Sequence, residues 1–389
     1  MSLHIPLSSP DITEAEIAAV TAVMRTHTLS LGPRLEEFEE RLAQLHGVSH
    51  AIAVSSGTAA LHLAMHALAI GPGDEVIVPS FTFIAVANAV RYVGATPIFV
   101  DIDPVTLNVD PACVEAAVTP RTRAMVVVHT FGVPADMDAL IAISEGHNIA
   151  IIEDACEAIG ASYKGTPVGG IGNISVFAFY PNKQITTGEG GAILCRDHAM
   201  AGRMRALRNQ GRYPCSDWLQ HAELGYNYRL PEMACALGIA QLDRLAEILD
   251  SRARVAALYD MALAPLTAIQ RPPTSIPHRS ISWFVYVVRL GDSLPDDARD
   301  RIMQSLQQQG IGCARYFAPI HLQPAYADDP STINLHLPVT ESVAQHTLAL
   351  PFFNRLTMEE IHAVADALSA PQWIGTAGVR PLMNADEHG

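Results

Sequence analysis

Short apolar runs alternate with helical patterns from about residue 48 onward. HAIAVSS, DEVIVPS and TPIFVDI each precede a segment with apolar residues at helical spacing, such as GTAALHLAMHALAI after the first run. RAMVVVHTFG, IAIIEDA, NISVFAFY and GGAILCR are further strand-like runs. This alternation predicts βαβ units around a mostly parallel sheet that is buried on both faces. Ligands of such sheets bind beyond the carboxyl ends of the strands.

The rest of the chain predicts a smaller second unit. One continuous helical pattern, PEMACALGIAQLDRLAEILDSRARVAALYDMAL, begins at Pro231. SWFVYVVRL then predicts a strand, and DARDRIMQSLQQQG and TMEEIHAVADALS predict helices, whereas the tail GTAGVRPLMNADEHG has no clear pattern. We expect an N-terminal arm and a large domain over residues 1–249, followed by a small α+β domain over residues 250–389.

Composition narrows the class of protein. The chain has 389 residues, of which 49% are hydrophobic and 17% charged, so it exceeds one ordinary core and is globular rather than disordered. A net charge of −15 argues against nucleic-acid binding, which needs a basic surface. The six cysteines form no C-x-x-C pair, so we expect no metal site and no disulfide framework.

The sequence predicts neither export nor membrane insertion. The start, MSLHIPLSSP, lacks the basic and apolar regions of a signal peptide. The most apolar long stretch is interrupted by serine, histidine and glycine, so it does not resemble a membrane span. We therefore expect a cytoplasmic protein.

Lysine is almost absent from the chain. Of the 25 Lys and Arg residues, only Lys164 and Lys183 are lysines. Lys183 lies in FAFYPNKQITTGEGG, between a strand-like run and a glycine turn. A primary amine can form a Schiff base with an aldehyde, whereas a guanidinium, which stays protonated, cannot. Lys183 is therefore a candidate for covalent catalysis, and we interpret Lys164, in YKGTPVGG, as a loop lysine.

Two further features follow predicted strands. The SSGT turn at residues 55–58 opens a helix, where free amides and the helix dipole can bind an anion. Glu153 and Asp154 close the strand IAII, which directs a carboxylate into the crevice. Each feature taken alone could equally be a helix cap.

Taken together, the amine, the carboxylate and the helix start suggest pyridoxal 5′-phosphate as the cofactor. A carboxylate such as Asp154 would keep the pyridine nitrogen protonated, and the helix start would hold the phosphate. Phe81, at the end of VIVPS, could cover the ring.

The order of motifs resembles the DegT/DnrJ/EryC1/StrS family of sugar aminotransferases. The similarity runs from about residue 8 to 370 through SSGTAAL, GDEVIVPSFTF, ATPIFVDID, IIEDACEAIGA, FYPNKQITTGEGG and GYNYRLPEMACALGIAQL. It implies an α/β fold of type I, the aspartate aminotransferase-like architecture, and a homodimer with active sites at its interface. It also implies transfer of an amino group from glutamate to a nucleotide-linked ketosugar.

The resemblance assigns a role to several of these residues. Lys183 matches the family's Schiff-base lysine, and Asp154 matches the partner of the pyridine nitrogen. Gly57 and Thr58 match the phosphate-binding backbone, and Phe81 matches the aromatic residue that stacks on the ring.

Other matches concern the subunit interface and the substrate. Asn227 matches an asparagine that reaches the phosphate from the neighbouring subunit. Arg229 could bind a carboxylate or diphosphate, or only an acidic side chain at the dimer surface. His321, in APIHLQPAY, resembles a sugar-contact position, whereas we interpret His129, in VVHTFG, as structural.

The sequence departs from the family pattern at two positions. Glu157 stands where many members have Gln or His near the ring hydroxyl, so this carboxylate would accept a hydrogen bond there or be protonated itself. Ala178 stands where many members have a phosphate-binding serine. One phosphate contact could then be missing or could come from Ser175.

We expect a pyridoxal phosphate-dependent aminotransferase whose substrate is a nucleotide-linked 4-keto-6-deoxyhexose. The alternatives are amination of a 3-keto sugar, dehydration on the same scaffold, and a non-catalytic regulatory protein. The family's dehydratases replace the lysine with histidine, so Lys183 argues against dehydration. The intact set of Lys183, Asp154, Gly57 and Thr58 argues against a degenerate scaffold.

Overall fold

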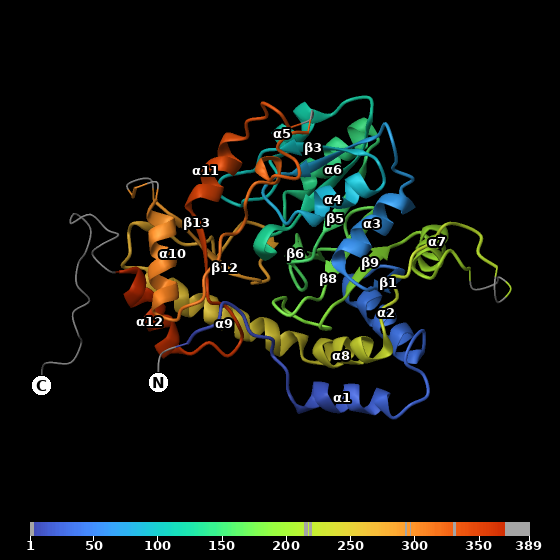
Figure 1. The fold of residues 1–389 in the computed structure, drawn as a ribbon, viewed down its shortest axis with the longest axis horizontal. Helices are drawn as coiled ribbons and strands as arrows, with labels where there is room; N and C mark the ends of the chain where they lie inside the picture. The colour runs from blue at the N-terminus through green and yellow to red at the C-terminus, as the bar shows by residue number, and fades with distance from the viewer. Residues whose placement is uncertain are drawn as a thin grey trace, which may run out of the picture.

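The fold has three layers, with a central sheet between two layers of helices and a smaller sheet at one end (Figure 1). It is seen here in a computed structural model of the chain. The structure describes residues 4–213, 217, 220–291, 294–295, 297–329 and 332–369. The tail from residue 375 onward, in which the sequence showed no pattern, lies outside the described residues.

Helices and strands alternate along the first half of the described chain, as the hydrophobic pattern predicted. The helices are α1 (Glu14–Met24), α2 (Pro33–His46), α3 (Gly57–Ala67), α4 (Ala85–Tyr92), α5 (Pro111–Ala117), α6 (Met137–His147), α7 (His198–Arg208), α8 (Glu232–Asp243), α9 (Leu245–Leu263), α10 (Ala298–Gln308), α11 (Pro338–His346) and α12 (Met358–Leu368), with 3₁₀ turns η1 (Thr130–Gly132) and η2 (Ile320–Leu322). The strands are β1 (His50–Val54), β2 (Glu75–Pro79), β3 (Thr96–Val100), β4 (Thr122–Val128), β5 (Ala150–Asp154), β6 (Ser162–Tyr163), β7 (Thr166–Pro167), β8 (Ile174–Ala178), β9 (Gly191–Cys195), β10 (Ile269–Gln270), β11 (Arg279–Ser280), β12 (Tyr286–Leu290) and β13 (Thr347–Leu350).

The central sheet has seven strands in the order β1-β9-β8-β5-β4-β2-β3. The neighbours from β8 to β3 pair in parallel, whereas β9 runs antiparallel to both β1 and β8. This arrangement confirms the mostly parallel sheet that the alternating runs predicted. The carboxyl ends of β4, β5 and β8 therefore meet at one edge, where ligands of open α/β sheets bind.

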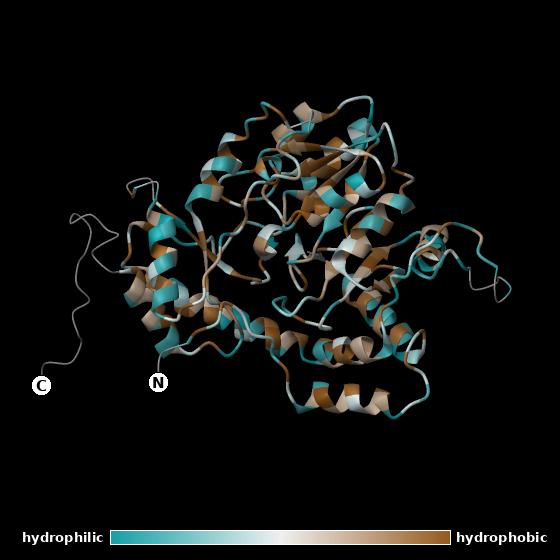
Figure 2. Cartoon of the chain, viewed as in Figure 1, coloured by the Kyte–Doolittle hydropathy of each residue, from teal (hydrophilic) through white to brown (hydrophobic). Residues whose placement is uncertain are grey.

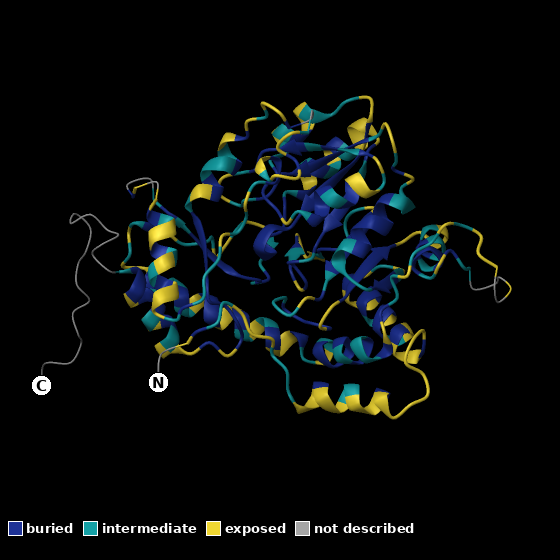
Figure 3. Cartoon of the chain, in the orientation of Figure 1, coloured by how far each residue is buried: buried dark blue, intermediate teal, exposed yellow. Residues whose placement is uncertain are grey.

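Each face of the sheet is covered by its own set of helices. Along β4, Val126 and Val128 pack into a cluster with α3 and α4, whereas Met125 and Val127 pack with α6 on the other side. Side chains of a strand point alternately to the two faces, so a strand buried on both faces is apolar at most of its positions. Figure 2 shows the resulting concentration of hydrophobic residues in the strands, and Figure 3 shows the same strands buried.

The small sheet, in the order β10-β12-β13, lies against α9, α10 and α12. Ile5 from the N-terminal arm packs into the same cluster and pairs with Ile311, so the chain's two described ends meet there. Ile320 and Tyr326 instead pack into the core of the large sheet. A domain boundary near residue 250 stays a prediction, because α9 runs through that point.

The long helical pattern after Pro231 forms two helices in the structure. α8 ends at Asp243 and α9 begins at Leu245, with Arg244 at φ −102° and ψ 7° between them. The Arg244 guanidinium forms ion pairs with Asp11 at 3.1 Å and Glu16 at 2.8 Å. Propensity alone cannot reveal this break, because the partners that hold Arg244 come from the distant N-terminal arm.

None of the helices in the described parts of the chain is both long enough and apolar enough to cross a membrane.

Glu232, the first residue of α8, caps a different helix. Its buried carboxylate accepts hydrogen bonds from the backbone N–H groups of Gly32, Arg34 and Leu35, at 3.0, 2.9 and 2.9 Å. These donors belong to the first turn of α2, where Gly32 offers no side-chain cap.

We expect Glu232→Ala to lower the free energy of unfolding by about 3 kcal/mol, because it leaves several buried donors without acceptors. Urea denaturation followed by circular dichroism measures this loss. Glu40→Ala, which removes an exposed carboxylate from α2, is the control and should change stability by less than about 0.5 kcal/mol. Equal stability of the two variants would show that the cap is dispensable.

Candidate active site

A cavity of about 530 Å³ opens at the carboxyl edge of the central sheet. Asp154 at the end of β5 and Ala178 at the end of β8 form its floor, together with the first turn of α3. Phe284, Tyr316 and Phe317 come from the C-terminal half of the chain and complete the wall. The cavity is therefore shared between the large sheet and the segments around the small one.

The start of α3 gives the cavity a set of backbone donors. Ser56 is the N-cap, and its side chain accepts a hydrogen bond from Ala59 N–H at 3.1 Å. The N–H groups of Gly57 and Thr58 have no acceptor within the helix and lie at the positive end of its dipole. A Cβ atom at Gly57 would lie 2.7 Å from the Cβ of Ala178, so only glycine allows this close packing.

The two carboxylates at the end of β5 serve opposite faces of the sheet. Asp154 lines the cavity and accepts a hydrogen bond from Cys156 N–H at 3.1 Å. Glu153 is fully buried and accepts hydrogen bonds from the loop at residues 169–172 and, at 3.2 Å, from the Ser175 hydroxyl. Because the Ser175 hydroxyl donates to Glu153, it does not supply the phosphate contact that a serine at position 178 would make.

Glu153 remains a carboxylate in spite of its burial. Burial by itself would raise the pKa of Glu153, but hydrogen bonds from His129 and from backbone amides outweigh it and lower the pKa. His129 accepts a hydrogen bond from Ala135 N–H at its Nδ1, so its Nε2 is left to donate to Glu153 at 3.1 Å. His129 is thus a structural residue, as the sequence suggested.

Lys183 lies on the turn that follows β8. Its backbone N–H donates to Tyr180 O at 2.9 Å, and its Nζ lies 4.0 Å from the centre of the Phe284 ring. The nearest carboxylate oxygen is Oε1 of Glu157, at 3.6 Å from Nζ. The amine thus projects into the cavity between an aromatic ring and a buried acid.

Glu157 has one oxygen held by the backbone and one facing the lysine. Oε2 accepts a hydrogen bond from Phe131 N–H at 2.9 Å. Burial raises the pKa of Glu157, although the nearby Lys183 and the hydrogen bond from Phe131 oppose this effect. The protonated form of Glu157 is therefore accessible nearer neutral pH than for an exposed glutamate.

The residues present fit pyridoxal phosphate. The amine of Lys183, the carboxylate of Asp154 and the first-turn amides of α3 all face one cavity. Asn182, beside Lys183 on the cavity wall, has a buried Oδ1 atom with no hydrogen-bond partner among the described residues. A polar ligand would give that atom a partner.

The structure does not place Phe81 on the cavity wall. Phe81 is fully buried and packs edge-on against Phe131 and Phe317. Phe83, two residues further along the loop, lines the cavity and is 62% exposed. Of the two aromatic residues in FTF, the one on the cavity wall is therefore Phe83 and not Phe81 as expected, because the turn after β2 directs Phe81 into the core.

Asn227 and Arg229 lie outside the cavity of their own chain. Asn227 is exposed and pairs through its backbone with Asn209, whose side chain accepts a hydrogen bond from Arg229 at 2.9 Å. The segment nevertheless runs beside the start of α3, because Tyr228 O accepts a hydrogen bond from Ser55 N–H at 2.9 Å.

His321 is also absent from the cavity wall. Its ring is buried and bridges the Ser80 hydroxyl at 2.7 Å and the Glu341 carboxylate at 3.2 Å. These contacts tie η2 to the end of β2, which is a structural role. The sugar contact suggested by the sequence would need a side chain that reaches the cavity.

Most of the aromatic residues that line the cavity were not predicted from the sequence. Phe284, Tyr316 and Phe317 lie more than 100 residues beyond Lys183, and no motif connects them with it. Tyr180 and Asn182 could have been predicted to line the cavity, since both belong to the motif that contains Lys183.

Comparison with known proteins gives consistent matches. Residues 10–369 match the model of the DegT/DnrJ/EryC1/StrS aminotransferase family. The GDP-perosamine synthase of Caulobacter vibrioides is 42% identical in an alignment of length 371 that covers 94% of this chain and 97% of that protein.

Solved structures of related proteins are also similar to this chain over nearly its whole length. DesV from S. venezuelae has a TM-score of 0.84 and 39% identity, covering 91% of this chain and 93% of its own. The aminotransferase TlmJ from Streptoalloteichus hindustanus has a TM-score of 0.87 and 32% identity, covering 94% of this chain and 97% of its own.

The raised pKa of Glu157 predicts a pH-dependent stability of the protein without added cofactor. Above the ordinary value of 4.5, the folded protein holds a proton on Glu157 that the unfolded chain has lost. The free energy of unfolding, relative to that of Glu157→Gln, should therefore fall as the pH rises from 4.5 through the raised pKa of Glu157 in the folded protein. Urea denaturation at a series of pH values measures it.

Glu189→Gln, which removes an exposed carboxylate from the same cavity, is the matched control and should follow the wild-type pH profile. A constant difference between wild type and Glu157→Gln at all pH values would contradict the prediction.

Proposed function

The chain belongs to the DegT/DnrJ/EryC1/StrS aminotransferase family, and we propose that it transfers the amino group of glutamate to a nucleotide-linked 4-keto-6-deoxyhexose. It is a pyridoxal phosphate-dependent sugar aminotransferase of fold type I. The nucleotide-linked substrate, glutamate as the donor, the homodimer and a cytoplasmic location are parts of the proposal.

One observation carries the proposal, namely that Lys183, Asp154 and the start of α3 face the same cavity. The identity of the substrate rests on similarity. A relative that is 42% identical over nearly the whole of both chains is a GDP-perosamine synthase, which supports a nucleotide-linked sugar as the substrate of this chain too.

The residues of the cavity divide the work of holding the cofactor. The first-turn amides of Gly57 and Thr58 would bind its phosphate, and the Asp154 carboxylate would pair with its ring nitrogen. Phe83, and not Phe81, would stack on the cofactor ring, because Phe83 lines the cavity. When bound, the cofactor supplies an aldehyde that condenses with amines and a ring that accepts electrons from the adjacent carbon.

Lys183 is the group that moves protons. Its Nζ would hold the cofactor covalently at rest and, once displaced by the donor amine, would take the proton from the donor's α-carbon. The same nitrogen can return a proton to the sugar carbon that receives the amine. Phe284 keeps water away from one side of Nζ, since its ring lies 4.0 Å from that atom.

Glu157 is suited to the position near the ring hydroxyl that the family resemblance gives it. In its protonated form it can donate a hydrogen bond from Oε1, whereas in its ionised form it pairs with Lys183. Both forms keep Oε2 on the Phe131 amide. The carboxyl can therefore follow the charge of Lys183 without moving.

A panel of nucleotide-linked 4-keto- and 3-keto-6-deoxysugars, incubated with the purified protein and glutamate, tests the function. We expect amination of a 4-keto sugar with release of 2-oxoglutarate, measured by mass spectrometry and NMR. Lys183→Arg keeps the charge but cannot form the imine, so it should give no product. Amination of only the 3-keto sugars would reject the proposed ring position, and turnover by Lys183→Arg would reject the role of Lys183.

We further propose that each active site is shared between two subunits through Asn227. Asn227 is exposed and lies in a segment that runs beside the start of α3, although its side chain does not line its own cavity. An amide donor from a second copy would compensate for the phosphate contact that Ala178 lacks.

Mixed dimers test this sharing. Lys183→Ala and Asn227→Ala chains, each impaired alone, are refolded together. If sites are shared, each mixed dimer holds one site with both residues intact, so activity should rise to about one quarter of wild type for random pairing. Activity that stays at the level of the parents would show that Asn227 serves its own chain.

A further inference from the structure

Arg252 is a buried guanidinium on α9 that lies just behind the cavity. Its side chain is 3% exposed, and its hydrogen-bond partners are neutral. Nη2 donates to the backbone oxygens of Asn182 at 3.2 Å and Phe284 at 3.5 Å, and Nη1 donates to Asn354 Oδ1 at 3.4 Å.

Two of these partners belong to the surroundings of the reactive amine. Asn182 directly precedes Lys183, so its carbonyl is part of the peptide bond that carries Lys183. Phe284 provides the ring that lies 4.0 Å from Lys183 Nζ. A single nitrogen of Arg252 therefore bridges the turn that carries the amine and the segment that carries its aromatic neighbour.

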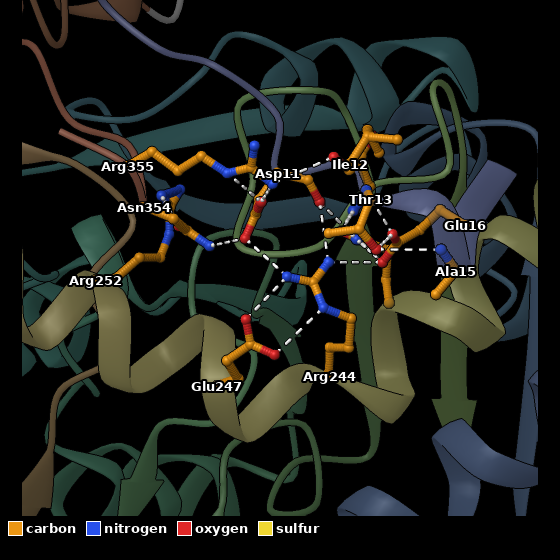
Figure 4. Close-up of polar contacts among 12 residues, drawn as sticks. Asp11, Ile12, Thr13, Ala15, Glu16, Arg244, Glu247, Arg252, Asn354 and Arg355 are labelled. Atoms are coloured by element: carbon orange, nitrogen blue, oxygen red, sulfur yellow. Dashed lines mark hydrogen bonds and ion pairs between the residues drawn. The ribbon is translucent and has the colours of Figure 1, made fainter.

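The other end of Arg252 is anchored in a network that Figure 4 shows. Asn354 donates a hydrogen bond to Asp11 Oδ2 at 3.0 Å. Asp11 is held in turn by Arg244 at 3.1 Å and by Arg355 at 2.7 Å. Arg252 is thus connected to the N-terminal arm, to the junction of α8 and α9 and to the segment before α12.

Holding two carbonyls does not by itself require a cation. A buried charge costs several kcal/mol unless it is compensated, and here the nearest acid, Asp11, acts through Asn354. Burial lowers the pKa of Arg252 to about 10, so the guanidinium remains protonated at neutral pH. Its planar fork can hold donors in several fixed directions at once, which a lysine cannot do.

We propose that Arg252 is a positioning residue for Lys183. It holds the Asn182–Lys183 peptide and Phe284 at a set separation, so that Nζ meets the cofactor aldehyde in one geometry. Held there, Nζ would add to the aldehyde carbon of a bound cofactor, with a C=N bond replacing the C=O bond and the oxygen leaving as water. This inference rests on the covalent role proposed for Lys183.

The test separates covalent capture from cofactor binding in cofactor-free protein. Capture of pyridoxal phosphate is followed by stopped-flow absorbance. The affinity of pyridoxine 5′-phosphate, which has the ring and phosphate but an alcohol in place of the aldehyde, is measured by calorimetry. Arg252→Lys and Arg252→Gln should slow capture by on the order of 10²-fold, the effect of a small misplacement of a reacting group. The Kd of pyridoxine 5′-phosphate should stay within about twofold of wild type, because the phosphate and ring contacts remain.

Arg254→Gln is the matched control, because Arg254 lies on the same helix. Its side chain donates a hydrogen bond to the backbone oxygen of Asn354 and does not contact the Asn354 side chain. It should leave both measurements unchanged. Asn354→Ala removes the acceptor of Nη1 while keeping Arg252, and should slow capture by about tenfold. This variant decides the question if the Arg252 variants do not fold, as judged by thermal unfolding.

Two outcomes overturn the inference, and a third tests the role of Lys183 on which it rests. Normal capture in the folded Arg252 variants, or in Asn354→Ala where they do not fold, would show that Arg252 does not position Lys183. An equal loss of capture and of pyridoxine 5′-phosphate affinity would show a general loosening of the cavity. Capture that survives in Lys183→Arg would instead reject the proposed role of Lys183, which distinguishes the two failures.

Discussion

A sheet covered by helices on both faces leaves its polar side chains one common place to meet, which is the carboxyl edge. The strands from β8 to β2 are buried over most of their length, so a carboxylate inside one of them needs a full set of donors, as Glu153 has. Asp154, one residue later, does not need a full set of protein donors, because its side chain lines the cavity. The alternation of side chains along β5 thus separates a buried acid from one that lines the cavity.

The cavity also depends on segments that the central sheet does not supply. Lys183 is carried by the large sheet, but the ring beside its amine, Phe284, comes from the approach to β12. Arg252 joins the backbones of these two segments, and the Asp11 network ties Arg252 to the N-terminal arm. The chemistry of an aminotransferase requires a mobile amine with a defined resting position, and this set of neutral hydrogen bonds around one buried cation provides such a position.

The hydrophobic pattern was sufficient to predict the order of strands and helices in the large sheet, because strands buried on both faces are mostly apolar. It was insufficient at Arg244, where a continuous helical pattern is split by ion pairs with Asp11 and Glu16. It also misled at Phe81, because both aromatic residues of FTF suit a wall by type and only the path of the loop selects Phe83. His321 shows the same limit, since burial between Ser80 and Glu341 cannot be inferred from its motif.

The sequence by itself determined which residues are candidates for the chemistry: Lys183, one of two lysines in an arginine-rich chain, an acid at the end of an apolar strand, and a glycine at the start of a helix. Those features are local, because each follows from residue type and from the neighbouring secondary structure. Only the tertiary structure decided what surrounds Lys183. Glu157 and Phe284 lie beside its amine, and Arg252 contacts the backbone of the preceding residue, each from a separate part of the chain. Contacts between distant segments depend on how layers pack, and packing is a property of the folded chain rather than of any one motif.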